Sequence, residues 1–197
     1  MPTIPKSTTL VFLGRAGSGK DTQIDFLLGR ADFVSAVKTD TGGRFRELVK
    51  NDSALWRKAK KVLDQGARQP DWFAFTLWLF LVGEKVRDEE ILVSSGSPRS
   101  LREARLIDEA LGFMERPSAV AVFIETGPPE AKKRLLLRGR HDDNDPEIEN
   151  RFAWFETDVL PAVEYYRKEG RLVELNGEQS PEEVFKELGK KLENYFA

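Results

Sequence analysis

The chain contains no cysteine and only one histidine, His141. Without cysteine there are no disulfide bonds and no thiolate ligands for a metal, and a single histidine cannot form a histidine cluster around a metal ion. A chain that lacks cysteine altogether is suited to a reducing compartment, so we expect a cytoplasmic protein.

A strong net charge and a long apolar run are also absent. The formal net charge of −2 gives no support for binding to nucleic acid or another polyanion. The most apolar segment, residues 72–82, has 11 residues and is too short to cross a bilayer. The N-terminal sequence MPTIPKSTTL carries no apolar run typical of a signal peptide. We therefore expect a buried core helix at 72–82, and neither a membrane nor a nucleic-acid partner.

The chain does have a glycine-rich turn between an apolar segment and a helical pattern. Residues 9–13 (TLVFL) predict a strand buried on both faces. The spacing from Gly14 to Gly19 and Lys20 then matches a phosphate-binding loop, in which backbone N–H groups and the lysine attract phosphate oxygens. Asp21 occupies the position where Ser or Thr is usual. The alternative is a glycine-rich turn with a lysine placed by chance.

Strands and helices alternate along the 197 residues, which is typical of a parallel sheet with helices on both faces. We predict strands at residues 9–13, 33–37, 91–93, 119–125 and 171–175. We predict helices at residues 22–28, 47–63, 72–87, 101–111, 128–138, 146–169 and 181–196. Gly66 is expected to end a helix, Asp71 to cap the next one, and Pro161 to kink the longest one. The prediction is therefore one α/β domain, residues 1–197, with a five-stranded parallel sheet flanked by helices.

Six arginines stand close to the ends of the expected elements or around one polar loop: Arg46, Arg99, Arg134, Arg138, Arg140 and Arg151. Phosphoryl transfer requires positioning and positive charge around the moving group, with little covalent help from the protein. A single arginine on a helix is usually a solvated residue, but a group at element ends indicates phosphoryl transfer. Asp142 and Asp143 lie among these arginines, and we interpret them as ion-pair partners rather than catalytic carboxylates.

Six segments resemble, in the same order and over nearly the full length of the chain, the adenylate kinases and other nucleoside-monophosphate kinases. They are GRAGSGKDTQ (14–23), TGGRFR (41–46), LDQGARQPD (63–71), GSPRSLREA (96–104), RLLLRGRHDDN (134–144) and LNGEQSPEEV (175–184). The resemblance implies a P-loop NTPase-like fold with a small helical monophosphate-binding insert at about 41–69 and a very short lid at about 139–145. So short a lid, without cysteines, has no place for zinc, and no zinc is expected.

The resemblance also implies the reaction. The terminal phosphoryl group of ATP would pass to a nucleoside monophosphate, giving two diphosphates, with Mg2+ as cofactor. AMP is the favoured acceptor, and GMP or another monophosphate is the alternative. The implied catalytic residues are Lys20, Arg99, Arg138, Arg140 and Arg151. The implied ATP-binding residues are Gly14, Gly17, Ser18, Gly19, Lys20, Asp21, Thr22, Arg134 and Gln179. The implied monophosphate-binding residues are Thr41, Arg46, Ala67, Gln69, Gly96, Arg99 and Glu103.

Two departures from the family pattern concern magnesium. Ser95 stands where the family usually has an aspartate that orders the water ligands of the metal, and Asp21 stands where it usually has glycine. We hypothesise that Asp21, with Thr22, supplies the contact to Mg2+ through water or nucleotide phosphates. The alternative is that Asp21 only stabilises the first turn of its helix.

Two further departures concern the acceptor base. Glu103 replaces a glutamine that faces the base, and Gln69 stands at a usually apolar position near it. An ionised glutamate has only acceptors and suits guanine, whereas a protonated one offers a donor and an acceptor and suits adenine. The alternative is that Glu103 faces Arg102 or solvent.

Two other functions remain open. One is a nucleotide-binding but non-catalytic relative, acting as a sensor or a partner domain, because the loss of the carboxylate at Ser95 would reduce turnover. The other is a small-molecule kinase on the same core, for a sugar or shikimate, which the segments 41–46 and 96–99 disfavour. We expect a monomer, the default for the family.

Overall fold

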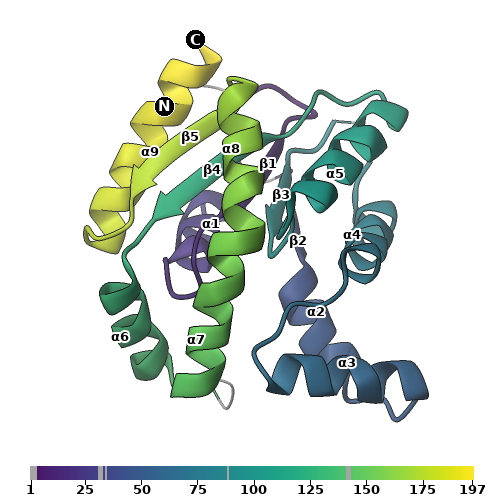
Figure 1. Ribbon diagram of the computed structural model, residues 1–197. Helices are drawn as coiled ribbons and strands as arrows, with labels where there is room; N and C mark the ends of the chain where they lie inside the picture. Colours follow the sequence, from purple (N-terminus) through teal and green to yellow (C-terminus); the bar gives the residue numbers. More distant parts are fainter. Residues whose placement is uncertain (1–3, 31–32, 34, 88, 141–142) are drawn as a thin grey trace.

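The computed structural model describes residues 4–30, 33, 35–87, 89–140 and 143–197 (Figure 1). Within these residues, five parallel strands form one sheet in the order β2-β3-β1-β4-β5. They are β1 (Thr9–Leu13), β2 (Val37–Asp40), β3 (Leu92–Ser95), β4 (Val120–Glu125) and β5 (Leu172–Asn176). The chain moves first to one side of β1 and then to the other, and ligands bind at the carboxyl end of the strands at such a switch point. The predicted parallel sheet is confirmed.

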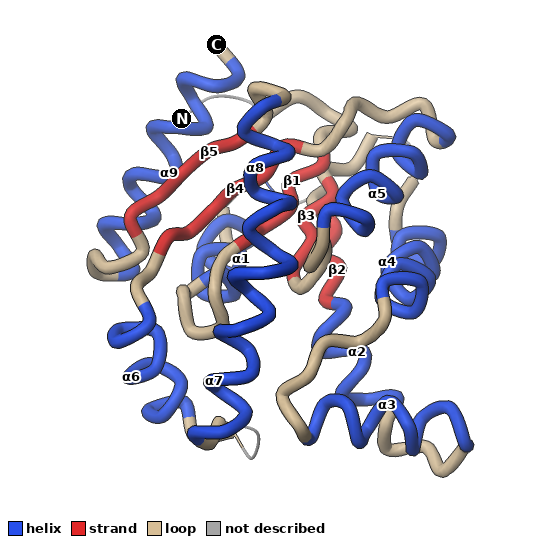
Figure 2. The backbone as a smooth tube through the Cα atoms, viewed as in Figure 1, coloured by secondary structure: helices blue, strands red, loops and turns tan. Residues whose placement is uncertain are grey.

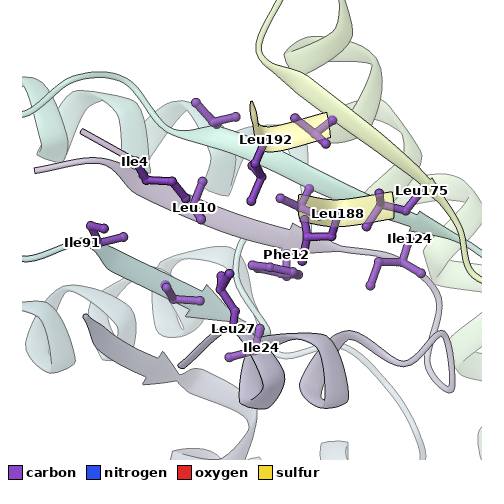
Figure 3. Close-up of a cluster of buried hydrophobic side chains, with 14 of the residues drawn as sticks. Ile4, Leu10, Phe12, Ile24, Leu27, Ile91, Ile124, Leu175, Leu188 and Leu192 are labelled. Carbon is purple, nitrogen blue, oxygen red and sulfur yellow. The ribbon is translucent and has the colours of Figure 1, made fainter. Parts of the chain in front are cut away.

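Helices cover both faces of the sheet (Figure 2). Successive residues of a strand point to opposite faces. Leu10 and Phe12 therefore pack with one layer of helices, as Figure 3 shows, whereas Val11 and Leu13 pack with the other. The first layer consists of α1 (Lys20–Leu28) and α9 (Pro181–Phe196), and the second of α4 (Asp71–Lys85), α5 (Leu101–Phe113) and α8 (Leu160–Lys168). Burial on both faces, worth roughly 25 cal/mol per Å2 of apolar area, holds β1 in place.

Two further groups of helices extend beyond the carboxyl edge of the sheet, opposite each other in Figure 1. One group contains α2 (Thr41–Leu48) and α3 (Ala54–Asp64), and the other α6 (Pro128–Arg138) and α7 (Asp145–Trp154). Each has a small apolar cluster: Phe45 of the first group packs against Phe73 of α4, and Leu135 of the second group packs against Ile148. The same edge of the sheet is therefore bordered from two sides.

The prediction of a strand at residues 33–37 is wrong. Strand β2 is Val37–Asp40, while Phe33 lies outside the strands and is buried in the core, and residue 34 lies outside the described residues. Within the described sheet, β2 is an edge strand paired only with β3. Three of its four residues are only partly buried and the fully buried one, Thr39, is polar, so no continuous apolar run marks β2 in the sequence. Of the residues predicted as this strand, Phe33 packs in the core, Ser35 is exposed, and only Val37 belongs to β2.

The prediction of one helix at 47–63 is also wrong. The chain forms α2 and α3 with a break between them, and Ser53 begins α3 by accepting a hydrogen bond from the N–H of Trp56 at 3.4 Å. The predicted stop is confirmed, because α3 ends at Asp64 and Gly66 has a φ of +63°.

Asp71 does not cap α4 as predicted, because it is the first residue of that helix and its side chain makes no capping hydrogen bond. Its carboxylate instead accepts a hydrogen bond from Oγ of Ser100 at 2.8 Å. The core helix expected at 72–82 is confirmed in α4, where Trp78 is fully buried, although Phe80 is 53% exposed. Among the described residues, no helix has the length and apolar character needed to cross a bilayer.

The long helix predicted at 146–169 contains a π-helical turn, η2 (Phe155–Val159), between α7 and α8. Pro161 follows this turn and has no N–H to donate to the carbonyl group of Thr157. The structure thus has a wider, π-helical turn just before the proline, and the kink predicted at Pro161 stays a prediction.

Candidate active site

The loop between β1 and α1 is built on glycines. Gly17 has a φ of +84°, and a β-carbon there would lie 2.4 Å from the carbonyl oxygen of Ala131. Gly19 has a φ of +91° and precedes the first residue of α1, Lys20. A side chain at either position would strain or displace the loop. The predicted glycine-rich turn at the N-terminus of a helix is confirmed.

Lys20 is held by the loop itself. Its Nζ donates to the carbonyl oxygens of Gly14 at 2.7 Å and Arg15 at 2.8 Å. Burial lowers the pKa of Lys20 to about 8, with Arg99 and Arg138 acting in the same direction and Asp21 opposing them. The ammonium group is therefore mostly protonated at pH 7 and carries its charge inside the loop.

A cavity of about 460 Å3 lies at the carboxyl edge of the sheet. It is lined by residues from the phosphate-binding loop and from both groups of helices that border this edge. The predicted site residues in its wall are Gly14, Gly17, Gly19, Lys20, Asp21, Thr22, Arg46, Ala67, Gly96, Arg99, Arg134, Arg138, Arg140 and Arg151. All six arginines singled out from the sequence thus face one space, although they come from segments far apart in the chain.

Asp143 joins arginines of the cavity wall. Its carboxylate accepts hydrogen bonds from Nε and Nη2 of Arg138 at 2.9 and 2.7 Å, and from Nη1 of Arg151 at 2.9 Å. Burial alone would raise the pKa of Asp143, but the bonds from Arg138 and Arg151 hold it below its ordinary value. The predicted pairing of Asp143 with the arginines is confirmed, and Asp142 and His141 lie outside the described residues.

Arg99 and Arg134 are oriented by carbonyl oxygens at opposite ends of the cavity. Nε of Arg99 donates to the carbonyl of Gly96 at 2.8 Å, and burial lowers the pKa of Arg99 from its ordinary value. Nη1 of Arg134 donates to the carbonyl of Gly177 at 2.8 Å. Gly177 follows β5, so Arg134 lies beside the end of that strand.

Asp21 and Ser95 are in direct contact. Oγ of Ser95 donates to Oδ1 of Asp21 at 2.7 Å. Burial alone would raise the pKa of Asp21, but the Ser95 hydroxyl and the charge of Lys20 lower it below its ordinary value. An ionised carboxylate and a hydroxyl group therefore lie together beside Lys20.

Five predicted site residues do not line the cavity in this conformation: Ser18, Thr41, Gln69, Glu103 and Gln179. The hydroxyl groups of Ser18 and Thr41 accept hydrogen bonds from Lys20 and Ser97, respectively. Nε2 of Gln69 donates to the carbonyl of Ala59 at 2.8 Å, and Nε2 of Gln179 donates to Glu187 at 2.8 Å. Of these partners only Lys20 lines the cavity, and the roles of the four residues in ligand binding remain predictions.

Glu103 is fully buried, not directed to solvent. Its Oε2 accepts a hydrogen bond from the backbone N–H of Arg99 at 3.0 Å, and Oε1 lies 3.5 Å from Nη1 of Arg68 without a hydrogen bond in the described part of the chain. Burial raises the pKa of Glu103 to about 7. One buried acceptor is therefore not satisfied by the described protein groups.

Sequence reasoning missed the apolar part of the cavity wall, which includes Phe45, Leu63, Trp154 and Val159. Trp154 contacts two other residues of the wall, because its Nε1 donates to the carbonyl of Gly66 at 3.0 Å and its ring centroid lies 5.6 Å from the guanidinium carbon of Arg99. These residues carry no motif. Their only sequence signal is their place beside predicted residues such as Arg151 and Ala67.

A phosphate-binding loop at the switch point of a parallel sheet, facing a cavity lined by arginines, defines an α/β phosphotransferase. The family model described as adenylate kinase matches residues 12–171. The chain is 31% identical over 187 residues to an adenylate kinase of Azobacteroides pseudotrichonymphae, covering 93% of this chain and 96% of that protein. It is 32% identical over 184 residues to adenylate kinase 1 of a Nostoc species, covering 92% and 96%. It is 34% identical over 181 residues to an adenylate kinase of Mycolicibacterium vanbaalenii, covering 89% and 94%.

The chain therefore belongs to the adenylate kinase family. Its class of activity is that of a nucleoside-monophosphate kinase, as the sequence predicted.

Proposed function

We propose that the protein transfers the terminal phosphoryl group of ATP to AMP and yields two molecules of ADP. The observation that carries this proposal is the single cavity into which the phosphate-binding loop and six arginines project. Transfer between two nucleotides requires two phosphate sites that face each other, with positive charge where the phosphoryl group moves. A reaction with water needs only one of these sites.

The donor phosphates would lie on the loop. The backbone N–H groups at the start of α1 favour anions, and Nζ of Lys20 is already held within the same turn. On phosphate binding, Lys20 would exchange its bonds to the carbonyls of Gly14 and Arg15 for phosphate oxygens. Arg134, anchored on Gly177, would lie along the donor base, with Gln179 nearby.

The acceptor phosphate would be gripped from the other side by Arg46 and Arg99, which both line the cavity. Arg99 is preoriented by Gly96. The base of the acceptor would lie between the apolar wall residues, with Thr41, Ala67 and Gln69 around it. Phosphate grip and base recognition would thus come from the insert at 41–69 and from the loop after β3.

The transferred phosphoryl group would be surrounded by Arg138, Arg140 and Arg151. Asp143 fixes Arg138 and Arg151 by charge-assisted hydrogen bonds, so less reorganisation is needed when negative charge develops on the moving group. Closure of the insert at 41–69 and the lid at 139–145 would exclude water and prevent hydrolysis. The lid contains two residues outside the described range, 141 and 142.

Magnesium is the proposed cofactor. When bound with the nucleotide, Mg2+ would partly neutralise the negative charge of the phosphate groups. It prefers oxygen ligands, keeps several waters and needs only one or two carboxylates. The carboxylate of Asp21 and the hydroxyls of Ser95 and Thr22 form an oxygen donor set that fits this ion. Among the described residues, no group of three or more His, Cys, Asp or Glu is placed to hold a metal, so nucleotide phosphates and water would supply the other contacts.

GMP is the alternative acceptor, because Glu103 occupies the position of a base-facing glutamine in the related kinases. In its ionised form Glu103 suits guanine, and in its protonated form it suits adenine. The raised pKa of Glu103, about 7, supports a substantial protonated fraction at neutral pH and therefore AMP.

A non-catalytic relative that only binds nucleotides is the second candidate, and Ser95 is the observation that favours it. A coupled assay of the purified protein with ATP, Mg2+ and each monophosphate in turn separates the candidates. Formation of ADP from ATP and AMP at a catalytic rate is the expected result. Binding of ATP without phosphorylation of any monophosphate would overturn the proposed function.

A further inference from the structure

Arg15, the second residue of the phosphate-binding loop, has a side chain that the catalytic roles above do not use. The residue is only 8% exposed and does not line the cavity. Its guanidinium carbon lies 4.4 Å from the ring centroid of Phe155 and 5.2 Å from that of Phe152. Nη2 donates to Oε1 of Glu156 at 2.6 Å, and Nε donates to the carbonyl of Thr126 at 3.3 Å. The side chain is therefore fixed in the wall behind the loop.

These contacts lead to the π-helical turn. Phe155 and Glu156 are the first two residues of η2, which joins α7 to α8 (Figure 1). Single π-helical turns inside α-helices occur frequently at functional sites. Arg151 lies one helical turn before Phe155 on the same helix and faces the cavity. The helix that carries Arg151 is thus tied to the loop by Arg15.

The backbone of Arg15 contacts the phosphate-binding loop itself. Its carbonyl oxygen accepts hydrogen bonds from Nζ of Lys20 at 2.8 Å and from the N–H of Ser18 at 3.1 Å. One residue therefore contacts the loop lysine through its main chain and the helix of Arg151 through its side chain.

A contribution to folding stability does not explain why the Arg15 guanidinium is buried against η2. A buried guanidinium loses its hydration, and replacing a buried ion pair with apolar residues is often neutral or stabilising. Nη1 of Arg15 is buried without a hydrogen-bond partner in the described part of the chain, which adds to this cost. A directional contact that fixes two elements relative to each other explains the residue better than a contribution to folding.

We propose that Arg15 is a positioning residue that holds the phosphate-binding loop against η2, so that Lys20 and Arg151 keep a fixed separation on the two sides of the transferred phosphoryl group. The inference rests on the proposed phosphoryl transfer. A small misplacement of such groups affects the chemical step much more than the binding of substrates.

The test compares Arg15→Gln, Arg15→Lys and Glu156→Gln with a matched control. Arg171 is the control residue, because it pairs with Asp108 at 2.8 Å and stacks on Tyr165 and Tyr166 at the start of β5, away from the cavity. Arg15→Gln should lower kcat between about 10-fold and 100-fold while both KM values stay within about twofold. Glu156→Gln should lower kcat by a smaller factor, again with little change in KM. Arg15→Lys, which keeps the positive charge, should have a higher kcat than Arg15→Gln. Arg171→Gln should lower the melting temperature and leave kcat unchanged.

A double-mutant cycle separates positioning from general damage. If Arg15 acts through the placement of Arg151, the fold-loss of kcat in the double variant Arg15→Gln/Arg151→Lys will be smaller than the product of the fold-losses in the two single variants. Independent, multiplicative losses would overturn the proposal, and so would an unchanged kcat in a folded Arg15→Gln variant.

A measurement without catalysis distinguishes a failure of this inference from a failure of the proposed function. In the unliganded protein, Arg15→Gln should increase hydrogen exchange at residues 14–20 and 151–159 relative to Arg171→Gln. If the wild type transfers no phosphoryl group, the proposed function falls, but the exchange experiment still decides whether Arg15 ties the two segments. Unchanged hydrogen exchange in both segments of Arg15→Gln would show that Arg15 does not hold the loop against η2.

Discussion

Oγ of Ser95 lies 2.7 Å from Oδ1 of Asp21 and donates a hydrogen bond to it, joining the end of β3 to the first turn of α1. The two residues that depart most from the family pattern around the metal are therefore neighbours in space. The hydrogen bond and the nearby Lys20 hold the pKa of Asp21 below its ordinary value despite its burial. The carboxylate of Asp21 thus lies next to Ser95, the position at which the family usually has an aspartate.

The first prediction concerns this pair. Because Asp21 would replace the carboxylate missing at Ser95, Asp21→Asn should raise the Mg2+ concentration needed for half-maximal activity by about 10-fold. Adding Ser95→Asp should restore much of the loss. Electron paramagnetic resonance of Mn2+ with ATP and each variant should follow the same order. If Asp21→Asn leaves the metal titration unchanged, the carboxylate has not moved, and a non-catalytic protein becomes the better interpretation.

The second prediction concerns Lys20. Its charge would act on the transferring phosphate oxygens, so Lys20→Ala should reduce kcat by roughly 100-fold to 1,000-fold. Lys38 is a suitable control, because it pairs with Asp25 at 2.7 Å and does not line the main cavity. Lys38→Ala should retain most of the activity. Near-normal turnover of Lys20→Ala in steady-state assays would contradict the assignment of the phosphate-binding loop.

The third prediction concerns the choice between AMP and GMP. Glu103 has a pKa of about 7, so its protonated form, which suits adenine, gives way to the ionised form as pH rises. The ratio of kcat/KM for AMP to that for GMP should therefore fall by about 10-fold between pH 6 and pH 8, the effect expected of one hydrogen bond to a charged group. Glu103→Gln should remove this pH dependence. The same ratio in both proteins at every pH would exclude Glu103 from base recognition.

The fourth prediction uses the same carboxyl group as a probe of folding. Its pKa is raised to about 7 in the folded protein from an ordinary value of 4.5. Between these pH values the folded state holds a proton that the unfolded chain has released, so the free energy of unfolding falls as pH rises. The destabilisation caused by ionised, buried Glu103 is therefore absent below pH 4.5 and complete above pH 7.

Glu103→Gln should therefore unfold at higher urea concentration than the wild type at pH 8, by a free energy of up to roughly 3 kcal/mol, and the difference should shrink toward pH 5. Glu109→Gln, on the exposed face of the same helix, should show no such dependence. A constant difference between wild type and Glu103→Gln across this pH range would show that burial does not perturb the carboxyl group.

The phosphate-binding loop and most strands are visible in the sequence because their signals are local. Residues 10–13 form an unbroken apolar run, since β1 lies in the middle of the sheet and is buried on both faces. Gly14, Gly19 and Lys20 are close together in the chain. In contrast, β2 lies at the edge and is only half-buried, so its pattern is too weak to fix its position.

The rest of the site depends on contacts that no short pattern encodes. Arg15 and Glu156 are 141 positions apart, and only the folded chain shows that the loop arginine packs on a helix. Asp71 resembles a helix cap in the sequence, but in the structure its carboxylate accepts a hydrogen bond from the hydroxyl of Ser100 on another helix's N-terminus. The apolar wall around Trp154 was missed for the same reason, because its members come from four separate elements.

Trp154, in the wall of the cavity, joins the helix of Arg151 to the carbonyl of Gly66, and the guanidinium group of Arg99 lies over its ring. The emission of an indole depends on the charges and solvent around it, and here any nucleotide that engages Arg99 alters both. Trp78, by comparison, is fully buried and hydrogen-bonded to Ser94, whereas Trp56 is partly buried and Trp72 is 55% exposed. In a variant with Trp56, Trp72 and Trp78 replaced by phenylalanine, the emission of Trp154 would therefore report occupancy of the cavity in solution without a dye or a label.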